Sequence, residues 1–166
     1  MITLTKPIQR EFDYKLSANR PLLPVKAAMA LLNQTEKQIA NLIELGLLLW
    51  AFDISRANAE HRREVRILQV SLVDYHRGVL PQEGWRDLRK EPASKSEWND
   101  VVKLILPNYD LRCSELARRF FCSSTHILQL LEDGSLQPVP MPGRKAKESP
   151  KVMRASVVEF LRRRIV

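Results

Sequence analysis

Apolar and polar positions follow the same pattern twice along the chain. Residues 25–48 (VKAAMALLNQTEKQIANLIELGLL) and 113–136 (CSELARRFFCSSTHILQLLEDGSL) share their apolar spacing, and Gly46 and Gly134 are 88 residues apart (134 minus 46). A further block, residues 66–75, matches residues 152–160 at an offset of 85 (160 minus 75). The three-residue difference between these offsets (88 minus 85) lies between the two matched blocks. A repeat with a variable loop in a fixed place predicts two copies of one small folding unit.

Each copy predicts two short helices joined by a tight turn. Thr35 and Ser123 stand where a hydroxyl accepts a bond from the first free N–H groups of the second helix. Gly46 and Gly134 stand where that helix ends in a left-handed residue. The apolar positions with helical spacing are Val25, Ala28, Met29, Leu31, Leu32, Ile39, Leu42 and Ile43 in the first copy, and Leu116, Ala117, Phe120, Ile127, Leu130 and Leu131 in the second.

A hairpin and a third helix are expected after each helix pair. In the first copy, residues 47–54 (LLLWAFDI) are rich in β-forming residues, residues 55–64 are charged and turn-like, and an apolar return at residues 65–67 leads to the helix. In the second copy the hairpin corresponds to residues 137–152, with Gly143 at its tip. Both copies therefore predict a helix-turn-helix followed by a two-stranded wing.

This arrangement resembles the excisionase and MerR-type DNA-binding domains. Their pattern, roughly V-x-E-A-A-x-L-L-x-V-S-x-x-T-V-x-x-L-I-x-x-G-x-L, is matched by Val25, Ala28, Leu31, Leu32, Thr35, Ile39, Leu42, Ile43, Gly46 and Leu48, and by Glu115, Ala117, Phe120, Ser123, Ile127, Leu130, Leu131, Gly134 and Leu136. The departures are Ala27, Met29, Gln34, Leu116, Arg119 and Phe121. The resemblance covers about two-thirds of the chain and implies winged helix-turn-helix units that bind DNA.

The expected fold is mainly α with small β-hairpin wings, as two tandem winged helix-turn-helix domains joined by a helical linker. Residues 1–20 form an N-terminal arm, residues 21–77 the first domain (unit one), residues 78–106 the linker, and residues 107–166 the second domain (unit two). Residues 94–106 carry apolar side chains at helical spacing and end before Pro107, which predicts the linker helix. This helix either packs the two units together or belongs to a flexible connection.

Charge and composition favour a polyanionic partner. The formal net charge is +8 and the isoelectric point is near 9.8, which suits nucleic acid. No apolar run approaches the roughly 18 residues of a membrane span and no signal-peptide core is found at the N-terminus. A cytoplasmic, nucleoid-associated protein is therefore expected, with Cys113 and Cys122 as buried thiols rather than a disulfide.

The residues expected to read base edges lie at the start of each second helix. In unit one they are Thr35, Glu36, Lys37, Gln38 and Asn41, and in unit two Ser123, Ser124, Thr125, His126 and Gln129. Asn41 and Gln129 coincide under the 88-residue offset, and both amides can pair with adenine. The alternative is that these side chains form only the solvated face of a helix. For His126 a plain surface histidine is a further alternative, and a metal ligand is not expected.

Basic residues cluster in the wings and last helices, where they would hold phosphates. The candidates are Arg56, Arg62, Arg63 and Arg66, with His61 nearby, in unit one, and Arg144, Lys145, Lys147, Lys151 and Arg154 in unit two. Arg162, Arg163 and Arg164 form a further run, for which a solvated charge cluster is the alternative.

We therefore expect a sequence-specific double-stranded DNA-binding protein without enzymatic activity, cofactor or metal. The resemblance suggests an accessory or architectural factor for recombination or transposition, with a recombinase or transposase as a further partner. A transcriptional regulator is the alternative, and a winged-helix protein-interaction adaptor the second alternative. The chain stops soon after its last helix begins, which disfavours an effector-sensing domain of the MerR kind. It would act as a monomer or as a multimer assembled on DNA.

Overall fold

A computed structural model describes residues 20–57, 63–78, 94–140 and 150–166. Within these ranges the chain has seven helices and five strands and is mainly helical, with small antiparallel sheets, as the sequence predicts. Unit one contains β1 (Leu22–Pro24), α2 (Val25–Leu32), α3 (Glu36–Glu44), β2 (Ala51–Asp53), β3 (Val65–Leu68) and α4 (Gln69–His76). Helix α5 (Lys95–Ile105) follows, and unit two contains β4 (Leu111–Arg112), α6 (Cys113–Arg119), α7 (Ser124–Glu132), β5 (Lys151–Val152) and α8 (Arg154–Arg163).

The backbone repeats at the positions that the sequence repeat marks. The turn between α2 and α3 contains Asn33 with φ 51°, and the turn between α6 and α7 contains Phe121 with φ 53°, 88 residues later. Gly46 and Gly134 have φ values of 72° and 80°. Glycine adopts this left-handed conformation without steric penalty, whereas phenylalanine does so only under constraint. The two helix pairs thus share one backbone design, and Phe121 is its strained position.

The three-stranded sheet of unit one has the order β1-β3-β2, and side chains from both of its faces are buried. Successive side chains of a strand point to opposite faces. Leu23, Ala51 and Ile67 belong to the core beneath α2 and α3, whereas Leu22, Phe52 and Leu68 belong to the larger core shared with α5 and unit two. The sheet is therefore the layer on which the two units meet.

Helix α5 packs the two units together, which decides between the two expectations for the linker helix. The Ser94 hydroxyl accepts a bond from the amide of Glu97 and caps the helix, 3.2 Å away. Trp98 lies in the larger core, with its ring centroid 5.8 Å from Trp50 and 6.4 Å from Phe52. Of the expected linker before this helix, residues 78–93, only Gly78 is among the described residues.

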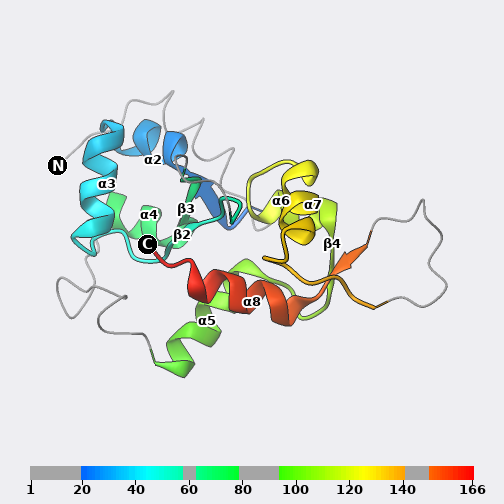
Figure 1. Ribbon diagram of the computed structural model, residues 1–166. Coiled ribbons are helices and arrows are strands. Elements are labelled where there is room, and N and C mark those ends of the chain that lie inside the picture. Colours follow the sequence, from blue (N-terminus) through cyan, green and yellow to red (C-terminus); the bar gives the residue numbers. More distant parts are fainter. Residues whose placement is uncertain (1–19, 58–62, 79–93, 141–149) are drawn as a thin grey trace.

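The end of the chain returns to unit one. Figure 1 shows α8 running back from unit two, so that the C-terminal residue lies beside the sheet of unit one. The amide of Asp53 donates to the oxygen of Arg164 and the amide of Val166 donates to the oxygen of Ala51, each over 2.9 Å. Ile165 pairs with Phe52 as an antiparallel bridge. Residues 164–166, here called the tail, thus cover the β2 edge of the sheet.

Candidate nucleic-acid interface

Helix α3 of unit one begins with a complete capping box. The Thr35 hydroxyl accepts a bond from the Gln38 amide over 3.2 Å, and the Gln38 side-chain oxygen accepts one from the Thr35 amide over 2.8 Å. Thr35 therefore has the cap role that the sequence predicts. The Gln38 carbonyl oxygen is used at the helix terminus, and the expected contact of this exposed side chain with a base stays a prediction. Glu36, Lys37 and Asn41 are exposed beside it.

Helix α7 of unit two begins in the same way but has a neighbour on one flank. Ser123 caps it by accepting from the amide of His126 over 3.2 Å. The His126 ring donates from Nε2 to the main-chain oxygen of Ile54, 2.6 Å away. This histidine is therefore a contact between the units rather than the free surface histidine of the alternative, and its Nε2 is not available for the expected base contact. Ser124 and Thr125 remain exposed, and Gln129 is half-buried.

The first wing is engaged at the far end of α7 as well. The Ala57 amide donates to Asp133 over 3.1 Å, and the Ser135 amide donates to the other carboxylate oxygen over 2.8 Å. Burial acts to raise the pKa of Asp133, but these bonds and nearby Arg56 bring it below its usual value. Residues 54–57 therefore lie along α7 from His126 to Asp133.

Arg66, expected as a phosphate-binding wing residue, is instead part of the joint between the units. Its side chain is 13% exposed. Nε donates to the main-chain oxygen of Phe120 over 2.9 Å, and an Nη donates to that of Phe121 over 3.0 Å, which satisfies carbonyls at the end of α6. Burial lowers the pKa of Arg66, with the Glu64 carboxylate opposing that shift. The interpretation of Arg66 as a free wing arginine is wrong, because its donors are occupied inside the molecule.

A further contact is made with the strained turn of unit two. The Arg20 guanidinium lies 5.0 Å from the centre of the Phe121 ring, a cation–π arrangement. Cys122 follows in the same turn, and burial raises the pKa of its thiol to about 12. Neither Cys113 nor Cys122 forms a disulfide, as expected. Arg20, the last residue of the expected N-terminal arm, and Arg66 of unit one therefore both contact this turn.

The remaining wing candidates divide between exposed and occupied side chains. Arg56, Arg63 and Lys151 are exposed. Arg154 is half-buried, and its Nε donates to the Pro107 oxygen over 2.7 Å, so this guanidinium is also used inside the fold. The other wing candidates lie outside the described residues: His61, Arg62, Arg144, Lys145 and Lys147.

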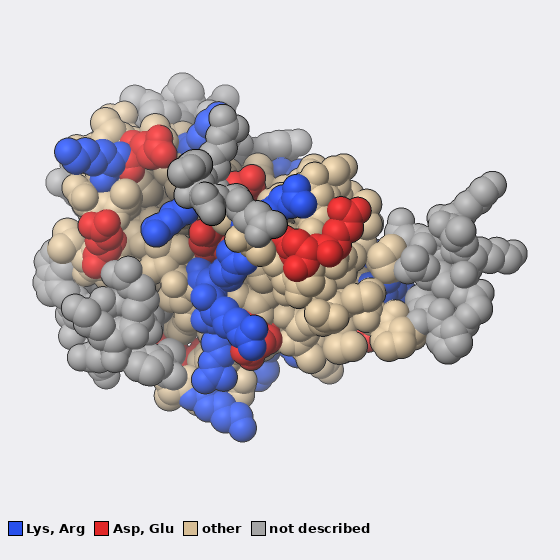
Figure 2. All heavy atoms as spheres, viewed as in Figure 1, with Lys and Arg blue, Asp and Glu red and all other residues tan. Residues whose placement is uncertain are grey.

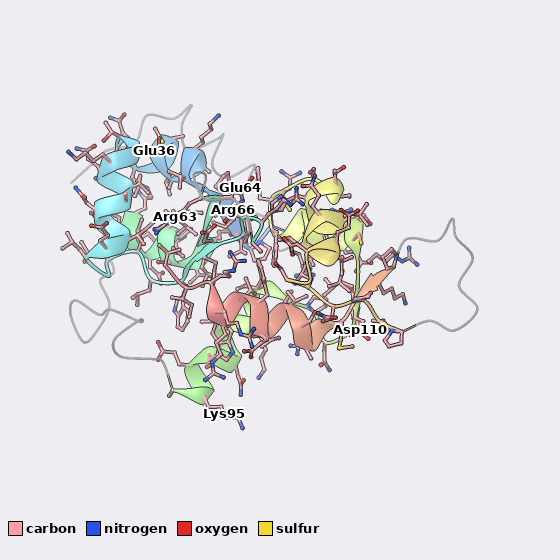
Figure 3. All side chains as sticks on the ribbon, viewed as in Figure 1. Glu36, Arg63, Glu64, Arg66, Lys95 and Asp110 are labelled. Atoms are coloured by element: carbon pink, nitrogen blue, oxygen red, sulfur yellow. The ribbon has the colours of Figure 1, made fainter. Side chains whose placement is uncertain are left out.

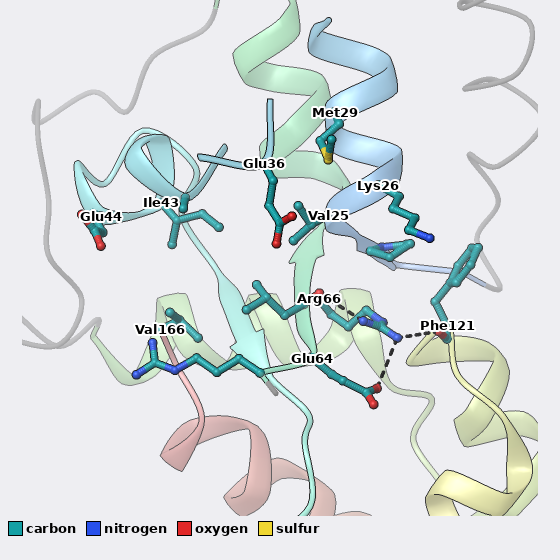
Figure 4. A pocket seen from close by; sticks show the side chains of 14 residues that line it. Val25, Lys26, Met29, Glu36, Ile43, Glu44, Glu64, Arg66, Phe121 and Val166 are labelled. Atoms are coloured by element: carbon teal, nitrogen blue, oxygen red, sulfur yellow. Dashed lines mark hydrogen bonds and ion pairs between the residues drawn. The ribbon is translucent and has the colours of Figure 1, made fainter. Parts of the chain in front are cut away.

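A groove of about 650 Å³ opens between α3, β3 and the end of the chain (Figure 4). Its walls include the apolar side chains of Met29, Ile43, Phe121 and Val166. Charged groups of both signs also line it, namely Lys26, Glu36, Glu44, Arg63, Glu64 and Arg66. The groove therefore adjoins the exposed start of α3 and is partly built by unit two and the tail.

The sequence reasoning missed the residues that join the units. No local pattern indicated Arg20, Phe121 or the tail as contacts, because their partners are distant in sequence. One signal was present: residues 47–52 form a continuous apolar run, which is typical of a strand buried on both faces.

Comparison with known proteins returned nothing: no family model, curated protein or solved structure matches the chain. Among the described residues, no helix has the length and apolarity to cross a membrane. In that same part of the chain, no three His, Cys, Asp or Glu residues are grouped so that they could hold a metal ion.

Proposed function

We propose that the chain is a sequence-specific double-stranded DNA-binding protein built from two winged helix-turn-helix units. The observation that carries the proposal is α3, which starts in a capping box and exposes Lys37 in its first turn and Asn41 one turn later. This is the part of a helix-turn-helix that contacts base edges in the major groove. An amide such as Asn41 can pair with adenine N6 and N7.

The repeated element order supports two such units rather than one. Both have a short strand, two helices separated by a left-handed residue, and a strand that leads into a third helix. Their exposed positions differ, since Lys37 and Asn41 correspond to Thr125 and Gln129. The target would therefore be two unlike half-sites rather than a palindrome. An accessory role in recombination or transposition is the use that we favour, and transcriptional regulation is the alternative.

Selection of binding sites from a random pool of duplex DNA tests this function. We expect an enriched, non-palindromic motif at near-physiological salt. Asn41→Ala should relax the preference at one base position, and Gln129→Ala at another, with overall retention little changed. Paired replacement of Lys145 and Lys147 by alanine should instead weaken binding to all sequences and flatten its salt dependence. Failure to enrich any motif would contradict sequence-specific binding.

A protein-interaction adaptor is the second candidate, and one observation favours it. A cleft of about 350 Å³ lies where the start of α4, the end of α5 and the end of α6 meet, and two exposed apolar side chains line it: Val70 is 43% exposed and Leu104 47% exposed. The side-chain oxygen of Gln69, which also lines the cleft, is buried without a hydrogen-bond partner among the described residues. If Leu104→Lys left the selected DNA motif unchanged but abolished an activity of the chain in cells, the adaptor function would be favoured.

A further inference from the structure

The described arginines fall into two groups according to what their guanidinium groups contact. In the first group the guanidinium donates to main-chain oxygens and holds the fold together: Arg66 to Phe120 and Phe121, Arg119 to Ile105, Arg154 to Pro107, and Arg164 to Ser55. These side chains are already used. A binding surface for a polyanion must therefore come from the second group, whose charged ends reach solvent.

Helix α8 presents two such arginines on its outward face. Val157, Phe160 and Leu161 are buried on the opposite side, whereas Arg162 and Arg163 are exposed. Arg163 is 75% exposed and pairs with Glu159 one turn earlier, with Nε and Oε1 2.9 Å apart. Such an exposed pair is weak and leaves donors free.

Lys95, the first residue of α5, continues this surface. It is exposed, and neither its side chain nor that of Arg162 has a hydrogen-bond or ion-pair partner in the part of the chain that the structure describes. A cation at the first position of a helix lies at the positive end of the helix dipole, which is unfavourable for folding. Lys95 is therefore not explained by the stability of α5.

Lys and Arg side chains gather on the face where α8 and α5 lie (Figure 1 and Figure 2). Figure 2 shows a band of Lys and Arg that crosses the middle of the molecule where α8 and α5 lie in Figure 1. Figure 3, in the same view, labels Arg63 near α3 and Lys95 at the lower end of α5. We define the basic band as Arg63, Arg162, Arg163 and Lys95. Arg63 also lines the groove beside α3, so this residue of the band adjoins the surface proposed to read DNA.

We propose that the basic band binds the phosphate backbone of the duplex whose bases α3 reads. The inference rests on the proposed function and extends it to a surface outside both wings and both recognition helices. The contacts are independent of sequence, because phosphates carry no base information. They fix the orientation of the duplex and make its affinity depend on salt. An alternative explanation for Arg162 and Arg163 is that cations in the last turn of α8 stabilise that helix through its dipole. This alternative does not explain Lys95, which is on another helix.

The experiment compares two triple variants that lose the same charge. The band variant combines Lys95→Ala, Arg162→Ala and Arg163→Ala. The control variant combines Arg77→Ala, Arg112→Ala and Arg118→Ala, which replaces exposed cations outside the band. The affinity of each for a mixed-sequence duplex is measured as a function of salt, and circular dichroism establishes that each is folded.

Each phosphate contact contributes about 0.9 to the slope of log affinity against log salt, so the band variant should flatten the slope by about 2 to 3. The control should change it by less than about 1. An equal change in both variants, or no change in the band variant while the wild-type chain binds DNA, would overturn the band alone. Absence of any DNA binding by the wild-type chain would overturn the proposed function as well. A second assay uses phosphatidylserine vesicles. If the wild-type chain and the control bind them, the band variant does not, and the salt slope for DNA is unchanged in the band variant, the band would be assigned to a membrane surface and the proposal overturned.

Discussion

Replacing Arg66 by alanine should destabilise the whole chain rather than weaken its contact with DNA. The substitution removes the two donors that reach the main-chain oxygens of Phe120 and Phe121, at 2.9 and 3.0 Å. It also removes a looser pair with Glu64, whose nearest oxygen is 3.7 Å from the guanidinium. The carbonyls left behind belong to the end of α6, in unit two.

The expected loss follows from these contacts. A hydrogen bond to a charged group contributes about 1.5 to 3 kcal/mol, and a half-exposed ion pair contributes about 1 kcal/mol or less. Burial of the guanidinium opposes this gain, as the lowered pKa of Arg66 indicates, and the substitution relieves that penalty. We therefore expect a net loss of about 2 to 4 kcal/mol in the free energy of unfolding. Arg66→Lys should lose about half as much, since an ammonium cannot span both oxygens in the same geometry.

Urea unfolding followed by circular dichroism measures this loss. Arg163→Ala is the matched control, because it also removes an arginine in an ion pair but from an exposed position, and it should lose about 0.5 kcal/mol or less. When the Arg66→Ala chain is folded and its DNA binding is measured, the slope of log affinity against log salt should equal that of the wild-type chain. A loss below about 1 kcal/mol for Arg66→Ala, similar to that of the control, would refute the assignment of Arg66 to the joint.

Three further predictions concern single residues. Thr35→Ala removes the cap of α3 and should lower the free energy of unfolding by about 1 kcal/mol. The control is Thr125→Ala, at an exposed position, which should lower it by less than about 0.5 kcal/mol. Equal losses in urea unfolding would contradict the cap. Cys122, with its pKa near 12, should react with a thiol reagent at pH 8 about a thousandfold more slowly in the native Cys113→Ala chain than in the unfolded one, and equal rates would contradict its burial. Because the folded state holds this proton more tightly, its contribution to stability should be lost as the pH rises from about 9 toward 12. Val166→Pro removes the amide that donates to Ala51 and should destabilise the chain by about 1 to 2 kcal/mol. Val166→Ala keeps this donor and should destabilise the chain less. A larger loss of stability for Val166→Ala than for Val166→Pro would contradict the pairing of the tail.

The parts of the fold that the sequence predicted depend on neighbours close in the chain. Thr35 and Ser123 cap helices through bonds to residues three positions later, and Gly46 and Gly134 end them through their own backbone freedom. The linker helix was predicted on the same grounds, since Ser94 and the apolar spacing that follows are local signals. Such signals are complete within about ten residues, so one sequence is enough to detect them.

The parts that it did not predict depend on partners far away in sequence. The distance between Arg66 and Phe120 is 54 residues, between His126 and Ile54 72 residues, and between Arg164 and Ser55 109 residues. Charge alone assigned Arg66 and Arg154 to phosphates, because an arginine that binds a carbonyl and one that binds a phosphate look the same in a sequence. For the basic band, composition indicated a polyanionic partner, but only the fold places α5 and α8 where one face of the molecule carries a band of Lys and Arg (Figure 1 and Figure 2).

The joint between the units affects how the proposed DNA sites would be read. Two units on a flexible tether gain affinity from a high effective concentration and tolerate variation in the distance between their half-sites. Here Arg66, His126 and the tail hold unit two against the sheet of unit one, so the separation of α3 and α7 is set by the fold. Since B-DNA turns once in about 10 base pairs, each inserted base pair rotates one half-site relative to the other by about a tenth of a turn. A joined pair cannot follow that rotation, so spacing becomes part of the specificity. Contacts that touch no base would then discriminate between DNA sites as effectively as those that do.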